Sequence, residues 1–152
     1  MIVDRLAELP GRRIVEASLA GTVLFAATTL PAARGVETFQ VPASVISLVL
    51  FLVSIPLSLL ALARAAVRTA RQEDRIGVGS LFFLQGSAPK PVRLLLLGSL
   101  ALSVVVSVVA AAREPFGILQ PVFPLSLAAQ WAARHGTFPR IRNPEEGPRR
   151  SG

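Results

Sequence analysis

The chain has 152 residues, of which 52% are hydrophobic, a mean hydropathy of +0.58 and a formal net charge of +7. This length favours a single domain, and this composition is too apolar for an ordinary soluble protein. The absence of cysteine excludes a disulfide framework, thiolate chemistry and cysteine-ligated metals. We therefore expect an all-α integral membrane protein, a polytopic bundle of four transmembrane helices.

The basic residues are arginines except for Lys90, and they lie between apolar runs rather than on one face. This distribution is typical of arginines that contact phosphate headgroups and set membrane topology. The competing interpretation of a sequence pI near 11.7 is nucleic-acid binding. Nothing in the chain resembles a recognition helix or an aromatic stacking platform, so we predict membrane lipids rather than nucleic acid as partners.

Residues 1–13 form a polar leader, which we expect to be a cytoplasmic tail that ends at the Pro10-Gly11 breaker. The apolar run over 14–33 then predicts a first transmembrane helix. Its single charge, Glu16, lies in the first turn, where a carboxylate reaches the interface. Small residues after the run are also compatible with a cleaved signal peptide, but a leader that mixes acids with bases favours a retained helix.

The charge-free run over 43–63 is long enough to cross the roughly 30 Å hydrocarbon core of a bilayer, so it predicts the second helix. Pro56 in its interior predicts a kink, because proline removes one backbone hydrogen bond. A basic cytoplasmic loop follows over 64–93. Its first four arginines recur at helical spacing, which indicates that the second helix continues beyond the bilayer as a basic amphipathic end.

Within this loop, the apolar run Ile76 to Leu84 is too short to span, so we expect it to lie at the interface or under the bundle. A re-entrant loop is the alternative. The run over 94–112 predicts the third transmembrane helix. Small side chains repeat there every four residues and form one stripe, which favours close helix packing. The stripe consists of Ser99, Ser103, Ser107 and Ala111.

The run over 116–133 is long enough for a fourth span but is weakened by two glutamines and two prolines. Charge placement decides in its favour, because four spans leave only Arg34 and Arg113 outside if the N-terminus is cytoplasmic. We therefore predict a multi-pass protein of the cytoplasmic membrane with both termini inside. Residues 134–152 have too few apolar residues to order themselves, so we expect a disordered basic tail.

No reactive constellation is evident in the sequence. The carboxylates lie in tails, loops or a first helical turn, and no pair shares an apolar segment where one could act as acid and one as base. His135 is the single histidine and cannot supply a typical metal set without cysteine. We predict no catalytic, cofactor-binding or metal-binding residue. A lipid-modifying enzyme is the alternative that would require Glu16 or His135.

The arginine and phenylalanine side chains expected at the cytoplasmic face are suited to recognition. They predict a surface for anionic lipid or for a partner, either another membrane protein or a second copy of this chain. We expect an accessory or scaffold subunit; the alternative is a small transporter or channel component that forms a pore by oligomerising. The surface comprises Arg64, Arg68, Arg71, Arg75, Phe82, Phe83, Arg140 and Arg142.

Two stretches carry a family resemblance: VGSLFFLQGSAPKPVR over 78–93 and REPFGILQPVFPLSLAAQWAARHGTFPR over 113–140. Together with the hairpin formed by the first two predicted helices, they resemble a group of small, uncharacterised integral membrane proteins of actinobacteria. The preference for arginine over lysine and the abundance of alanine, glycine and proline fit a GC-rich genome of that kind. The resemblance implies a multi-span membrane protein and carries no assigned chemistry.

Overall fold

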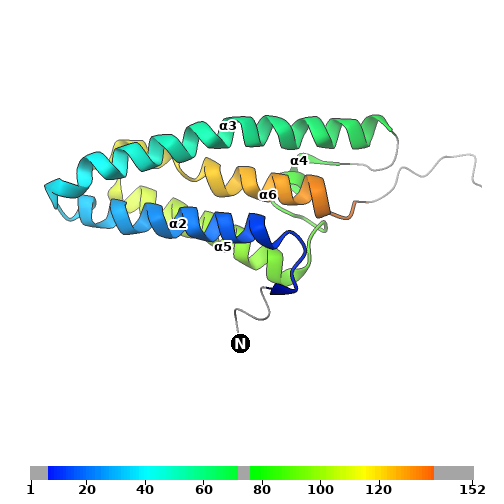
Figure 1. Cartoon of the computed structure of the whole chain (residues 1–152), viewed down its shortest axis with the longest axis horizontal. Coiled ribbons are helices and arrows are strands. Elements are labelled where there is room, and N and C mark those ends of the chain that lie inside the picture. Colours follow the sequence, from blue (N-terminus) through cyan, green and yellow to red (C-terminus); the bar gives the residue numbers. More distant parts are fainter. Residues whose placement is uncertain (1–6, 72–75, 139–152) are drawn as a thin grey trace, which may run out of the picture.

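The computed structural model describes residues 7–71 and 76–138, and within these ranges the chain is helical with no strand (Figure 1). The expected all-α fold is thereby confirmed. In chain order the elements are α2 (Arg12–Ala33), η1 (Glu37–Phe39), α3 (Gln40–Ala70), α4 (Val78–Phe82), α5 (Lys90–Ala110), η2 (Pro115–Leu119) and α6 (Val122–His135).

Three helices, α2, α3 and α5, are long and apolar enough to cross a membrane. With 22, 31 and 21 residues they extend about 33, 46 and 32 Å. Large apolar side chains remain exposed on their outer sides, for example Val41, Leu59 and Val108. Such surfaces suit hydrocarbon better than water. The structure thus supports three of the expected membrane helices.

The helix α3 is continuous through Pro56 and continues past Arg64 to Ala70, which confirms the predicted extension. Near the proline, the Ser54 hydroxyl donates to the Phe51 carbonyl at 2.5 Å. A serine that bonds back to the preceding turn is a common way to occupy backbone carbonyls near a helix irregularity.

Hydrogen bonds fix the directions of the helices. Ser18 of α2 meets Ser99 of α5 at 2.6 Å, and Thr22 meets Ser103 one turn later at 3.3 Å, so these two helices run parallel. Ser44 of α3 contacts Glu114 before α6, and Leu57 contacts Gln130 within it, so this second pair is parallel too. Consecutive long helices alternate in direction along the long axis of the molecule (Figure 1).

The helix α6 is the centre of the bundle. It packs against α2, α3, α4 and α5, and ten of its 14 residues are buried. Gly21 allows the close approach of α2, because a Cβ at this position would lie 2.3 Å from the Phe123 ring. Because other helices cover α6, its side chains face the protein interior. This position can accommodate the polar and proline residues in its sequence.

The expected fourth span over 116–133 consists of two pieces, η2 and α6, and the prolines explain the break. In a continuous α-helix the carbonyls of Gly117 and Gln120 would accept from residues 121 and 124, but both are prolines without an N–H. The Gly117 carbonyl instead accepts from Gln120 N at 3.2 Å and from the Ser107 hydroxyl at 2.7 Å. Phe123 N donates to the Gln120 carbonyl at 2.8 Å, again with the tighter 3₁₀ spacing.

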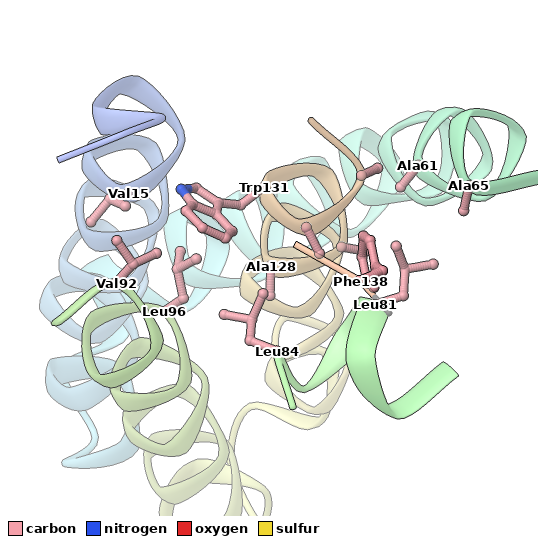
Figure 2. Close-up of a cluster of buried hydrophobic side chains, with 13 residues drawn as sticks. Val15, Ala61, Ala65, Leu81, Leu84, Val92, Leu96, Ala128, Trp131 and Phe138 are labelled. Carbon is pink, nitrogen blue, oxygen red and sulfur yellow. The ribbon is translucent and has the colours of Figure 1, made fainter. Parts of the chain in front are cut away.

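The short run over 76–84 packs under the bundle. Leu81 and Leu84 are buried in the hydrophobic cluster around α6, together with Phe138 (Figure 2). The backbone N–H of Thr137 donates to the Ser87 carbonyl at 3.0 Å and ties the end of α6 to this segment. The tail expected to be disordered from residue 134 is therefore ordered as far as Phe138, and residues 139–152 lie outside the described ranges.

Candidate functional site: the basic end of the bundle

One end of the bundle gathers the basic side chains. The directions of the helices bring the starts of α2 and α5 to the same end as the last turns of α3 and α6 (Figure 1). We call this region the basic end and define it by the following residues: Arg12, Arg13, Arg64, Arg68, Arg71, Arg134 and His135. Arg64 and Arg68 of α3 make structural contacts, and Arg71 is exposed after α3. The other four residues line a groove.

The N-terminal segment folds over the last turns of α6. The Trp131 Nε1–H donates to the Pro10 carbonyl at 2.7 Å, and the indole ring is 1% exposed. Gly11 follows with φ +70° as the N-cap of α2. A Cβ there would lie 2.7 Å from both Trp131 and His135, so the close approach as well as the positive φ favours glycine.

A groove of about 410 Å³ lies between the start of α2 and the end of α6. Three arginines and a histidine line it with the apolar side chains of Leu9 and Ile14. Arg12, Arg13 and Arg134 are all exposed, and Arg12 also forms an ion pair with Glu16 at 2.5 Å. The planar guanidinium binds phosphate oxygens in a bidentate manner, so this groove suits an anion that carries an apolar group. Its lining residues are Leu9, Gly11, Arg12, Arg13, Ile14, Arg134 and His135.

The arginines of α3 that were expected on the recognition surface are half-buried and face α6. Arg64 Nη1 donates to Gln130 Oε1 at 2.5 Å, and Gln130 Nε2 donates to the Leu57 carbonyl at 2.6 Å. Arg68 donates to the carbonyls of Ala133 and Gly136 at 3.3 and 3.4 Å. Its guanidinium also lies 5.0 Å from the centre of the Phe138 ring, a cation–π contact.

These contacts give Arg64 and Arg68 a structural role at the end of α6. A cation near the last carbonyls of a helix is favourable because that end carries a partial negative charge. The other members of the predicted surface are placed differently. Arg71 is exposed after α3, Phe83 is exposed, and Phe82 packs partly against the core. Arg75, Arg140 and Arg142 lie outside the described residues.

The predicted stripe of small residues lies largely inside the bundle. Ser99 and Ser103 hydrogen bond to hydroxyls of α2, and Ser107 donates to the Gly117 carbonyl. Ala111 follows α5 as its C-cap and is half-buried. Among the described residues no group of three His, Cys, Asp or Glu side chains is placed to hold a metal ion.

Sequence reasoning missed the groove because its two sides are more than a hundred residues apart. The sequence places Arg12 and Arg13 in the polar leader, and Arg134 and His135 in the predicted basic tail. The available signal was that basic residues flank the first apolar run at its start and the last apolar run at its end. If these two runs are antiparallel neighbours, the flanking residues must meet at one end.

Comparison of the chain with models of protein families, with curated proteins and with solved structures finds no match. The resemblance to small actinobacterial membrane proteins therefore stays a prediction.

Proposed function

We propose that the chain is an integral membrane protein that crosses the bilayer four times, the fourth time as η2 and α6. Five residues of 3₁₀ helix and 14 of α-helix extend about 31 Å, close to the thickness of the hydrocarbon core. The alternating directions of the long helices support this topology. Because α6 is surrounded by the other helices, its polar residues need not face lipid.

The orientation we propose places the basic end in the cytoplasm, since loops rich in arginine are retained on that side. The opposite end carries few basic residues, Arg34 and Arg113. The cytoplasmic leaflet also holds the anionic lipids, and each arginine near its surface contributes about 1 kcal/mol to attraction. The groove would then lie at the depth of the lipid headgroups.

The biochemical role that we propose is that of a non-catalytic accessory or scaffold subunit held in place by an anionic phospholipid. The observation that carries this proposal is the convergence of Arg13, Arg134 and His135 on one groove with an apolar wall. A lipid phosphate would contact the guanidinium groups while its acyl chains follow the apolar outer sides of the helices. A partner membrane protein, or a second copy, would pack on the exposed apolar side of α3.

Lipid selectivity tests this proposal. The double variant Arg13→Gln, Arg134→Gln is expected to weaken the preference for phosphatidylglycerol over phosphatidylcholine by about 1 kcal/mol for each arginine. Spin-labelled lipids measure this preference as the immobilised fraction around the protein in vesicles.

The matched control is Arg34→Gln, Arg113→Gln, which removes the same charge at the other end of the bundle. It should leave selectivity near the wild-type value. If both double variants lower the preference equally, net charge rather than the groove determines lipid binding, and the proposal is wrong.

A further inference from the structure

A second group of polar side chains is buried at the end of the bundle opposite the basic end. One part of this group lies on η2 and on Glu114 and Gln120, the residues directly before and after it. Glu114, Gly117 and Gln120 are spaced by three, and backbone hydrogen bonds of 3.2 Å link Gly117 to Glu114 and Gln120 to Gly117. Side chains three apart in a 3₁₀ turn lie on the same side. All three residues are buried, with Glu114 2% and Gln120 0% exposed, so this side faces the bundle interior.

The helix α3 contributes two serines to the same place. The Ser44 hydroxyl donates to the Glu114 carboxylate, with distances of 2.9 and 3.1 Å to its two oxygens. The segment containing η2 and α6 runs parallel to α3, with Ser44 at Glu114 and Leu57 at Gln130. This register places Ser47, one turn after Ser44, opposite residues 117–120. Ser47 is fully buried.

Several polar atoms at this end have no hydrogen-bond partner among the described residues. They are Ser47 Oγ, both side-chain atoms of Gln120, and Thr29 Oγ1. By the parallel register of α2 and α5, Thr29 lies opposite Ala110, directly before the Glu114 segment. Buried polar atoms are almost always hydrogen bonded, and each one left without a partner costs about 1–3 kcal/mol. Their concentration at one end marks this place as a candidate site for a polar ligand.

A negative charge on Glu114 would have no compensating cation among the described residues. Glu114 makes no ion pair within the described ranges, and its contact there is one hydroxyl, which has a single hydrogen to donate. The neighbouring Arg113 is exposed, and its guanidinium lies beside Gly35 instead. A buried carboxylate is strongly unfavourable unless a cation or several donors compensate for it.

We propose that this site binds one monovalent cation of the sodium class, held by the Glu114 carboxylate, the hydroxyls of Ser44 and Ser47, and Gln120 Oε1. The proposed ligands are all oxygen atoms, which hard cations prefer. One carboxylate balances one positive charge, whereas calcium and magnesium sites commonly use more charge or substrate phosphates. The cation would satisfy the Ser47 and Gln120 oxygens and compensate Glu114 at once. This inference does not depend on the lipid groove.

The test is sodium binding to the purified full chain in detergent, with ²²Na⁺ as the probe in equilibrium dialysis. Thermal unfolding in sodium chloride and in N-methyl-D-glucamine chloride at equal ionic strength provides a second readout. We expect saturable sodium binding and a higher Tm in sodium, because a ligand that binds only the folded state stabilises it.

Glu114→Gln and Ser47→Ala should each weaken sodium binding by about tenfold or more. The matched control Glu37→Gln removes an exposed carboxylate at the same end and should bind sodium as the wild type does. Ser47→Ala protects the test from a folding failure, since deleting an unpartnered hydroxyl should not lower the Tm in sodium-free buffer. Equal Tm values in both salts, no saturable binding, or unchanged binding in Ser47→Ala would each overturn the proposal. Absence of saturable binding would indicate water in place of the cation, and unchanged binding in Ser47→Ala would show that sodium binds elsewhere.

Discussion

Replacement of Trp131 by alanine is expected to lower the free energy of unfolding by about 3–5 kcal/mol, the range observed for large aromatic side chains in protein cores. The ring is 1% exposed and lies between α2 and α5, against Val15, Val92 and Leu96 (Figure 2). The variant would also lose the hydrogen bond from Nε1 to the Pro10 carbonyl, which holds the N-terminal segment over α6. Unfolding of the purified protein in mild detergent, followed by circular dichroism, measures the change.

Two further variants separate the contributions of the Trp131 ring. Trp131→Phe keeps most of the apolar contact and removes the indole donor, so it should cost less than the alanine variant. Phe83→Ala is the control, because this aromatic side chain is 47% exposed near the same end and should change stability by no more than about 0.5 kcal/mol. Similar losses in Phe83→Ala and Trp131→Ala would contradict a buried, structural indole.

The second large effect is expected at Gln130. Gln130→Leu should destabilise the protein by about 2–3 kcal/mol, because hydrogen bonds to charged groups are among the stronger ones. The substitution leaves the half-buried Arg64 guanidinium without its acceptor and the Leu57 carbonyl without this donor. Thermal unfolding in sodium-free detergent solution measures the loss.

Gln120→Leu is the matched comparison, since Gln120 is equally buried but neither of its side-chain polar atoms has a partner among the described residues. In sodium-free buffer this variant should be neutral or stabilising, because it replaces an unsatisfied amide with an apolar group of similar size. If Gln130→Leu were as harmless as Gln120→Leu, the bond from Arg64 would contribute nothing to the packing of α3 on α6.

The three long apolar helices were predictable from the sequence because crossing a bilayer imposes a simple requirement of length and polarity. The charge-free run over 43–63 and the run over 94–112 each correspond to a long helix in the structure. The spacing of Arg64 and Arg68 also correctly predicted that the second helix continues beyond the apolar run. These features depend on local sequence alone.

The interior of the bundle was harder to predict because hydropathy measures suitability for lipid and not suitability for a protein interior. Gln120 and Gln130 weakened the prediction of the last span, yet both are buried by neighbouring helices. The inward direction of Arg64 depends on where α6 lies, which no local pattern reveals. Likewise, the burial of Trp131 requires the N-terminal segment to fold back over a residue 121 positions away.

Cysteine accessibility tests the proposed four-span topology most directly, because the chain has no cysteine of its own. Single cysteines at the exposed positions Glu37, Gln85 and Thr137 report on the segments after α2, before α5 and after α6. The reagent is a membrane-impermeant maleimide applied to intact cells. Four crossings with the basic end inside predict that only Glu37→Cys is labelled before permeabilisation. Labelling of Thr137→Cys in intact cells would contradict the account, and Gln85→Cys would then distinguish three crossings, where it stays protected, from an inverted bundle, where it is labelled.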